Sequence, residues 1–399
     1  MSEKKKIDFS KLKKLGKMDI KDLNKIFSKN SSSSKATSNS KFKKMVKASM
    51  EKPKNILAFD IGSSSIKMVT GKYFKNKLTI NKLIDIPTPE GTVGDGKILG
   101  KQALGDMIQF ALKENRIKIK DVICTTNSSL VINREIVIPK VEEEEMETVI
   151  RYEIKQYLPI NLNDYIIQFV VLDEIIDDVG AKLKVSVISY PETMVYAYYD
   201  LLNSLELNPY SLDIAYNSLN KIVNYSNLNE DNGEILGGAV AFVDMGATSI
   251  NVTILKNGKL DFTRIIKTGG DNINYALSQS LDMSIKSTES TKIEKGNLLD
   301  IREDDLVNTT IRQVMDEGLE ELERILQFYV NKSSGIEISK IYIYGGVANT
   351  KGIDSYMEEK LKINVEKITK LNNVDFSSKE LLEEPIGEFI NAIGSIIRL

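Results

Sequence analysis

A short acidic turn near residue 60 combines residue types that bind phosphate and magnesium. Asp60 follows an apolar run, Gly62 comes two residues later, and three hydroxyl residues come next: Ser63, Ser64 and Ser65. Glycine lets a backbone approach an anion closely, and the successive N–H groups beyond it can form a nest for phosphate oxygens. Asp60 can hold Mg²⁺ through water, because magnesium keeps several of its waters. We therefore predict a phosphate and metal site at this turn.

The same arrangement recurs far along the chain. Asp244 follows a second apolar run, and it is followed by a glycine and small residues: Gly246, Ala247 and Thr248. A repeated phosphate turn predicts two duplicated lobes that close on one nucleotide. Asp60 and Asp244 would then face each other as the magnesium-holding and catalytic carboxylates.

Three further features could complete a nucleotide site. Lys67, on the strand expected after the first turn, is a candidate phosphate contact, and a lysine on a strand face is the alternative. Gly269 and Gly270 follow a predicted strand and open a predicted helix. Gly345 and Gly346 do the same later in the chain. Backbone without side chains can lie against a ligand or a flat base, although paired glycines also occur in ordinary turns.

The composition excludes several kinds of chemistry. There is no histidine among the 399 residues, and Cys124 is the single cysteine. This excludes Ser-His-Asp hydrolysis, histidine-ligated zinc, an internal disulfide and iron–sulfur clusters. Carboxylate, hydroxyl, lysine and backbone chemistry remain, which suits phosphate and magnesium. Cys124 lies in an apolar run and is expected to be a small buried strand residue.

Hydrophobic periodicity predicts the elements that must hold these turns. An apolar run before each aspartate and an alternating run after it predict a β-hairpin around each turn. The other clear patterns predict strands at 78–83, 121–126, 134–140, 165–172 and 183–189, and helices at 101–115, 141–159, 192–206 and 311–330. A turn is expected at Lys256-Asn257-Gly258, and a short helix near the end of the chain.

Residues from about 130 to 190 show a pattern of predicted elements that differs from the rest of the first lobe. Their order β-α-β-β predicts a compact subdomain inserted into the first lobe. Glutamates crowd the first turn of its helix, where they favour the helix dipole. The apolar face of that helix is expected to consist of Val149, Ile150, Tyr152, Ile154 and Leu158. Pro159 is expected to end the helix.

Charge and composition divide the chain. Residues 1–52 contain 16 lysines and five acidic residues, a net charge of +11, whereas the whole chain carries −2. We predict a basic, flexible N-terminal tail over 1–52, a first lobe over 53–238 and a second lobe over 239–399. Two interpretations of the tail stay open: a solubilising segment, or a short amphipathic segment over 7–27 that contacts anionic lipid or a partner.

The order of these features resembles that of the actin-like ATPase superfamily, which includes actin, sugar kinases, chaperone ATPases and the division protein FtsA. The resemblance covers residues 54–399. It implies an α/β fold of two duplicated ribonuclease-H-like lobes, with the β-α-β-β subdomain inserted in the first lobe.

Within that superfamily the sequence resembles the PilM family of type IV pilus assembly proteins. One stretch that carries the resemblance is an acidic helix with Arg151, Glu153, Leu158 and Pro159. Another is a Phe-x-Arg-x-Ile segment that leads to the first glycine pair, followed by a Glu-x-x-Lys. The third is the C-terminal AIGSIIRL. Thr288 stands where the family often has alanine before that glutamate.

The resemblance implies a role for each candidate residue. The β- and γ-phosphates would lie at Asp60, Gly62, Ser63, Ser64 and Lys67. The opposite phosphate loop would be Asp244, Gly246, Ala247 and Thr248, with Gly269 and Gly270 beside the nucleotide. The ribose or adenine would contact Glu289 and Lys292, and the adenosine would pack on Gly345, Gly346 and Val347. Asp213 would orient water or magnesium-bound water; a helix N-cap or turn role is the alternative.

The resemblance also implies a function. The protein would be a platform that binds ATP and Mg²⁺ with at most slow hydrolysis, in the cytoplasm at the inner face of the cytoplasmic membrane. Its partner would be the cytoplasmic N-terminal peptide of a PilN-like bitopic membrane protein, held beside the inserted subdomain. Pilus assembly ATPases are further candidate partners. Membrane association would be indirect or through the tail, and specific nucleic-acid binding is not expected.

Two other functions of the same fold stay open. A small-molecule kinase would require a substrate pocket with a catalytic aspartate. An FtsA-like filament protein would usually end in an amphipathic membrane helix, whereas this sequence ends in IIRL. The basic tail could supply an equivalent anchor.

Overall fold

The first acidic turn joins strands β1 (Ile56–Ile61) and β2 (Ser65–Phe74), which pair antiparallel. These strands belong to a six-stranded sheet with the order β10-β6-β1-β2-β3-β18. The remaining strands of this sheet are β3 (Lys77–Pro87), β6 (Asp121–Thr126), β10 (Asn208–Ile214) and β18 (Val374–Phe376). Strand β6 is parallel to both β1 and β10, so the carboxyl ends of these three strands lie together at the edge that holds Asp60.

These elements belong to a computed structural model that describes residues 53–157, 161–177, 180–231, 234–235, 238–300, 302 and 304–398. Residues Pro53–Leu399 form one unit. The tail over 1–52 and the two helix-ending positions, Leu158 and Pro159, lie outside the described residues.

The second acidic turn joins β13 (Ala239–Met245) to β14 (Ile250–Lys256) in a second sheet. This sheet has five strands in the order β15-β14-β13-β16-β17. Its other strands are β15 (Lys259–Ile266), β16 (Ile338–Tyr344) and β17 (Val365–Lys367). The predicted turn at Asn257-Gly258 joins β14 to β15. Both residues have positive φ, as a two-residue hairpin turn of type I′ requires.

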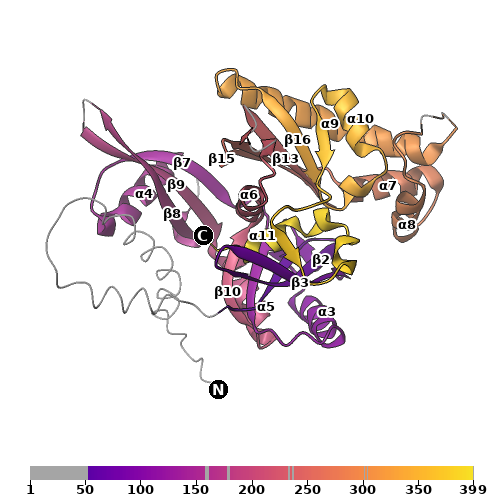
Figure 1. The fold of residues 1–399 in the computed structure, drawn as a ribbon, viewed down its shortest axis with the longest axis horizontal. Coiled ribbons are helices and arrows are strands. Elements are labelled where there is room, and N and C mark those ends of the chain that lie inside the picture. Colours follow the sequence, from indigo (N-terminus) through magenta and orange to yellow (C-terminus); the bar gives the residue numbers. More distant parts are fainter. Residues whose placement is uncertain are drawn as a thin grey trace. The chain divides into compact units, whose positions relative to one another are not determined.

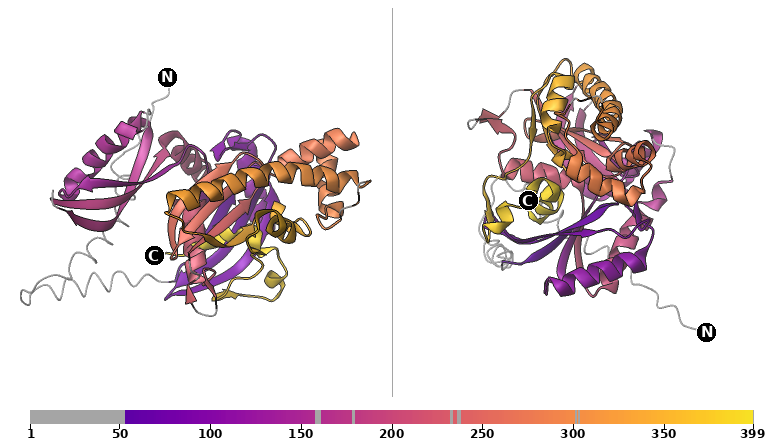
Figure 2. Two further views of the ribbon diagram at one scale, coloured as in Figure 1. Left: turned by 90° about the horizontal axis from the view of Figure 1, so that it is seen from above. Right: turned by 90° about the vertical axis from the view of Figure 1, so that its right-hand side faces the viewer.

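Helices of both lobes pack on the sheets or on one another (Figures 1 and 2). They are α3 (Lys101–Glu114), α5 (Glu192–Ser204), α6 (Ala215–Tyr225), α7 (Gly270–Leu281), α8 (Ile285–Lys295), α9 (Leu306–Lys332), α10 (Ile353–Leu361) and α11 (Ile390–Ile396). One face of the first sheet packs on α3 and α5, and one face of the second packs on α7, α9 and α10. No helix in the described part of the chain is long and apolar enough to cross a membrane.

The inner faces of the two sheets share a core. Figure 1 shows α6 and α11 between the sheets. Ala58 of the first sheet, Phe242 of the second and Ile393 of α11 belong to one cluster of buried residues. The helices approach closely, because a side chain at Gly394 of α11 would overlap the carbonyl of Ser218 in α6. The two lobes are therefore joined by packed helices directly beneath the two acidic turns.

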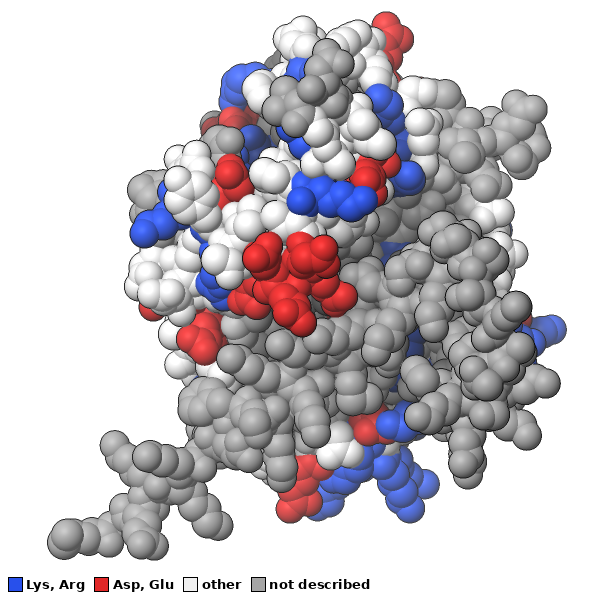
Figure 3. Space-filling view, turned by 90° about the vertical axis from the view of Figure 1, so that its left-hand side faces the viewer, with Lys and Arg blue, Asp and Glu red and all other residues white. Residues whose placement is uncertain are grey.

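The inserted subdomain consists of β7 (Ile132–Pro139), α4 (Glu143–Tyr157), β8 (Tyr165–Asp177) and β9 (Gly180–Pro191). Its strands form a three-stranded sheet in the order β7-β9-β8. Ile150 and Ile154 of α4 pack on that sheet, but the prediction for Tyr152 was wrong, since its side chain is 68% exposed. The glutamates at 142–145 are exposed, and acidic side chains gather on this side of the molecule in Figure 3.

Two segments differ from the sequence-based expectation. Residues 208–214, where no strand was predicted, form the edge strand β10. Near the C-terminus, β18 pairs with β3 of the first sheet, and α11 packs against β1, β2 and β6. The last part of the chain therefore returns from the second sheet to the first.

Candidate functional site

The two acidic turns have the same local geometry. The N–H of Gly62 donates to the Ser65 carbonyl at 3.0 Å, and the N–H of Gly246 donates to the Ser249 carbonyl at 3.0 Å. A side chain at Gly62 would come within 2.9 Å of that carbonyl. Each turn thus uses glycine because its own backbone folds back tightly.

The tight turns also change which N–H groups could meet an anion. The Gly62 N–H is taken by its own turn, so the predicted nest must begin at Ser63. The N–H groups of Ser63 and Ser64 have no backbone acceptor among the described residues. Thr88 holds the turn from behind: its hydroxyl donates to the Gly62 carbonyl at 2.8 Å and its N–H to the Ser64 carbonyl at 2.9 Å.

The structure brings the two turns together. The Ser63 hydroxyl lies 3.4 Å from the Thr248 hydroxyl across the two lobes. Behind them, the Asn391 side-chain amide of α11 donates to Asp60 Oδ2 at 3.1 Å and to Asp244 Oδ2 at 3.3 Å. One amide group therefore links the carboxylates that the sequence places in different lobes.

This pairing changes the acidity of both carboxyl groups. Burial raises the pKa of Asp60 to about 6 and the pKa of Asp244 to about 7. The negative charge of Asp60 raises the pKa of Asp244 further, while the hydrogen bonds from Asn391 oppose the rise at both groups. Two facing carboxylates in a buried site repel each other unless a cation lies between them. This arrangement suits a divalent cation.

The predicted glycine pairs lie against the second turn. Gly345 has φ +90°, and a side chain there would come within 2.6 Å of Asp244 Oδ1. The N–H of Gly270 donates to the Gly246 carbonyl at 3.1 Å, and a side chain at Gly269 would overlap the Ala247 carbonyl. Gly269 and Gly345 are required because atoms of the acidic turn lie too close to them for a side chain.

Glu289 and Lys292 lie on α8 beside the first glycine pair. Lys292 Nζ lies 2.9 Å from Glu289 Oε2, and the side-chain amide of Asn274 also donates to Glu289. A side chain at Gly270 would come within 3.4 Å of Lys292 Nζ and 3.0 Å of a Val347 methyl group. Candidate residues from three separate stretches of sequence therefore meet at one place.

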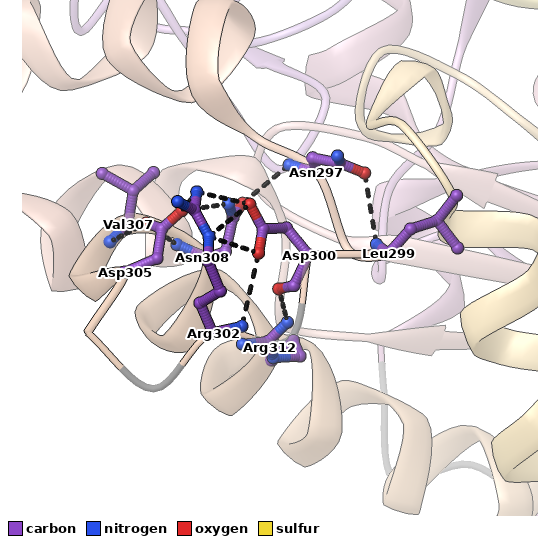
Figure 4. A network of polar contacts seen from close by, with 8 residues as sticks. All are labelled: Asn297, Leu299, Asp300, Arg302, Asp305, Val307, Asn308 and Arg312. Atoms are coloured by element: carbon purple, nitrogen blue, oxygen red, sulfur yellow. Dashed lines mark hydrogen bonds and ion pairs between the residues drawn. The ribbon is translucent and has the colours of Figure 1, made fainter.

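A polar network fixes the loop between α8 and α9 (Figure 4). Asp305 caps α9 by accepting hydrogen bonds from the N–H groups of Val307 and Asn308. The Asn308 side chain in turn accepts the Asn297 N–H at 2.6 Å. The loop also meets the segment after β16, since the Leu298 N–H donates to the Lys351 carbonyl at 2.9 Å. The network thereby ties α8, with Glu289 and Lys292, to the segment that follows Val347.

Lys67 is already engaged with protein groups. Its side chain is 11% exposed, and its ammonium group pairs with Asp85 at 2.9 Å and with Glu388. In the sheet Lys67 lies directly opposite Asp60, so the two side chains share a face. Lys67 lies next to the acidic turn, its ammonium group forms ion pairs in this state, and the phosphate contact stays a prediction.

Asp213 has a structural role in this state. Its carboxylate accepts hydrogen bonds from Asn217, Ser218 and Lys221 of α6 at 2.6, 2.8 and 2.6 Å. Both Asp213 and Lys221 are almost fully buried at this pair. Asp213 thus holds the start of α6 through side chains, but it is not the N-cap of that helix, which is Ile214. Its role in orienting water stays a prediction.

Three residues of the site were missed by sequence reasoning. From the C-terminal segment, Asn391 contacts both aspartates and Glu388 contacts Lys67 beside the first turn. Thr88 contacts the first turn just after β3. Asn391 lies immediately before the family-like ending AIGSIIRL, which was the nearest signal. Their partners are far away in sequence, so no local pattern indicates these contacts.

The residues present fit a magnesium nucleotide. Mg²⁺ binds oxygen ligands and usually takes one or two carboxylates together with substrate phosphates. The two turns offer the carboxylates of Asp60 and Asp244 and the hydroxyl groups of Ser63 and Thr248. Asn391 Oδ1 is buried without a hydrogen-bond partner among the described residues, so the site has unused polar capacity. No cluster of three or more acidic, cysteine or histidine side chains that could hold a metal ion occurs in the described ranges.

Two duplicated lobes, each with an acidic turn and joined by α6 and α11, define an actin-like ATPase fold. Residues 58–398 match the family model of the type IV pilus assembly protein PilM. The chain belongs to this family.

Solved structures agree on the fold. The PilM–PilN type IV pilus biogenesis complex is similar with a TM-score of 0.72 and 24% sequence identity, over 86% of this chain and 97% of that one. The ethanolamine utilization protein EutJ from Carboxydothermus hydrogenoformans has a TM-score of 0.51 and 11% identity, over 90% of this chain and 99% of that one.

A curated relative is matched over a shorter stretch. Cell division protein FtsA of Bacillus subtilis is 24% identical over 143 residues, which cover 32% of this chain and 32% of FtsA. The chain thus matches about a third of the length of that relative.

Proposed function

We propose that this protein is an assembly platform of the type IV pilus machinery whose conformation is set by a magnesium-bound adenine nucleotide. The observation that carries the proposal is the meeting of Asp60 and Asp244 from duplicated turns in a chain of the PilM family. Bound Mg²⁺ would neutralise the phosphates and the two carboxylates at once.

The protein's own residues suggest how a nucleotide would be held. Ser63, Ser64 and Thr248 would donate to the phosphates, and Asp60 and Asp244 would hold the waters of the metal. Gly270, Glu289, Lys292 and Val347 meet at the place where the ribose and base would lie. A ligand that touches both lobes favours the closed arrangement by its differential affinity for that arrangement. Such a ligand can therefore change the affinity for a partner.

We propose that the partner is the cytoplasmic N-terminal peptide of a PilN-like bitopic membrane protein. The similar solved structure is a complex of PilM with PilN. A cytoplasmic segment next to a membrane helix is typically rich in lysine and arginine. The exposed glutamates at 142–145 of the inserted subdomain would attract such a peptide.

Unsatisfied polar groups support a binding place at the base of this subdomain. The hydroxyl oxygens of Ser189, at the end of β9, and Tyr216, at the start of α6, are buried without a hydrogen-bond partner among the described residues. Buried polar groups normally have a partner, and a bound peptide offers backbone donors and acceptors. Tyr216 packs in a small cluster with Tyr190 and Met194, which lies where the subdomain joins the first lobe.

A binding measurement tests the partner. A synthetic peptide with the N-terminal sequence of the PilN-like protein of the same genome is titrated into the purified full chain. We expect binding that weakens with salt and falls about tenfold when Glu143, Glu144 and Glu145 are changed to glutamine. The matched control changes the exposed Glu320, Glu321 and Glu323 of α9 to glutamine, and it should bind normally. Absence of any peptide binding would contradict the proposed partner.

The match to FtsA supports one alternative, a membrane-associated filament protein. That function predicts that the full chain co-sediments with anionic vesicles when ATP and Mg²⁺ are present. The platform function predicts sedimentation that does not depend on nucleotide.

A further inference from the structure

We propose that Glu388 is a built-in competitor of the nucleotide phosphates for Lys67, so that it sets the nucleotide affinity of the site. This inference rests on the proposed function. Glu388 lies in the 3-10 segment Ile386–Phe389, directly before α11. No sequence pattern singled it out, and its partners lie in both lobes.

The contacts of Glu388 make a bridge across the lobes. One carboxylate oxygen pairs with Lys67 of β2, in the first sheet. The other accepts a hydrogen bond from the Asn349 side chain at 2.7 Å, and Asn349 ends the segment Val347–Asn349 after β16 of the second sheet. Glu388 therefore fixes Lys67 and, at the same time, ties the first sheet to the segment proposed to hold adenosine.

Burial strengthens the ion pair between Lys67 and Glu388. The side chains of Lys67 and Glu388 are 11% and 17% exposed, whereas Asp85, the other acidic partner of Lys67, is 48% exposed. Charge pairs screened by less water are stronger. Lys67 also lies over the Phe389 ring at 5.5 Å, which restricts the ammonium group to this side. Glu388 is thus the partner that a phosphate group would have to displace.

The geometry places the competition next to the phosphate turn. Lys67 is the cross-strand neighbour of Asp60, and its positive charge opposes the rise that burial causes in the pKa of that carboxyl group. A phosphate held at Ser63 and Ser64 would be another anion near the same ammonium group. One ammonium group cannot be fully paired with both the carboxylate and the phosphate. Nucleotide binding would therefore release Glu388, and with it the bridge to Asn349.

A double-mutant cycle with magnesium ATP tests the competition. Binding of magnesium ATP to the nucleotide-free full chain is measured by calorimetry for Glu388→Gln, which keeps the shape and removes the charge. We expect binding about tenfold tighter than for the unchanged protein, as for the loss of one charge-assisted contact. In the Lys67→Met background the same Glu388→Gln change should leave the affinity unchanged. Glu384→Gln removes an exposed charge two residues before that 3-10 segment and should have no effect in either background.

The outcomes are distinct. The inference would be overturned if Glu388→Gln and the unchanged protein had equal affinity for magnesium ATP. It would also be overturned by a gain of the same size in the Lys67→Met background, because the Glu388 charge would then repel the phosphates without acting through Lys67. If none of the proteins binds magnesium ATP, the proposed function itself fails.

A second variant tests the same bridge in case Glu388→Gln does not fold. Asn349 is exposed, so Asn349→Ala is expected to fold normally. It removes one support of the Glu388 carboxylate and should tighten magnesium ATP binding by a smaller factor, again solely when Lys67 is present. An affinity that Asn349→Ala does not change, in a variant that melts normally, would overturn the bridge.

Discussion

Asn391 links the carboxylates of two aspartates that come from different lobes. Its amide donates to both Asp60 and Asp244, and each carboxyl group has a raised pKa because burial disfavours its charged form. The folded protein therefore binds protons at these groups more tightly than the unfolded chain does. The stability that depends on these protons is present at low pH and is lost as the pH rises through about 7.

The pH dependence gives the first prediction. Asp244→Asn removes a charge that the folded protein must bury above pH 7. We expect the variant to increase the free energy of unfolding at pH 8 by at least about 1 kcal/mol. The difference should shrink as the pH approaches 4, where the native carboxyl group is already protonated. Denaturant unfolding at several pH values measures the difference in the free energy of unfolding between the variant and the unchanged protein. A difference that does not vary with pH would contradict the raised pKa of Asp244.

Gly346 allows stability and nucleotide binding to be separated. A side chain there would meet no atom within 4 Å, and the residue has an ordinary helical φ of −61°. We expect Gly346→Ala to melt like the unchanged protein. Its affinity for magnesium ATP should fall about tenfold, because the added methyl group would lie where adenosine is proposed to pack.

The control for this prediction is a glycine whose substitution should change stability and leave nucleotide affinity unchanged. Gly335 is also in open space but has φ +86°. Gly335→Ala should lower the free energy of unfolding by about 1 kcal/mol through backbone strain and leave nucleotide affinity unchanged. If Gly346→Ala binds magnesium ATP normally, adenosine does not pack on that glycine.

At the scale of elements, each acidic turn stands on a hairpin whose strands are already visible in the sequence. Continuous apolar runs predicted β1 and β13, because strands covered on both faces need apolar side chains throughout. The glycine pairs also follow strands and open helical segments, as predicted. These features are local, so their signals survive in a single sequence.

The features that were missed depend on contacts between distant residues. Asn391 lies 331 residues from Asp60 and 147 from Asp244, and Glu388 lies 321 residues from Lys67. The pairing of β18 with β3 likewise joins opposite ends of the folded unit. Tyr152 was misplaced because it was assigned by its largely apolar ring, although it lies two residues from both Ile150 and Ile154 and so points away from their face of the helix, into water. Periodicity predicts faces, but it does not predict which distant element comes to cover them.

The crossing of α6 and α11 gives a prediction for the element scale. Gly394→Ala would force a methyl group against the Ser218 carbonyl, so the helices would have to move apart. We expect a loss of about 1–3 kcal/mol in the free energy of unfolding. Gly105→Ala in α3 is the matched control, because its new methyl group would meet side chains at ordinary distances of 3.6 and 3.8 Å. That control should be neutral or slightly stabilised, and equal melting of both variants would contradict the close crossing.

At the scale of the whole folded unit, the shared core between the sheets couples the two turns to each other. Phe242 of the second sheet and Ile56 of the first belong to the same buried cluster as α11. Asn391, on that helix, touches both carboxylates. A ligand held by both turns is therefore expected to stabilise both lobes as one cooperative unit, and the inserted subdomain extends from the first of them.

Equilibrium binding of magnesium ATP to the nucleotide-free full chain, with thermal unfolding of the same samples, tests this account most directly. The account predicts binding that chelation of Mg²⁺ weakens and that Asp60→Ala and Asp244→Ala each reduce at least tenfold. At a free ligand concentration of 100 times Kd, the folded unit should gain about 2.7 kcal/mol in a single transition. The account is contradicted if the unchanged protein does not bind the nucleotide, or if both alanine variants bind it as tightly as the unchanged protein does.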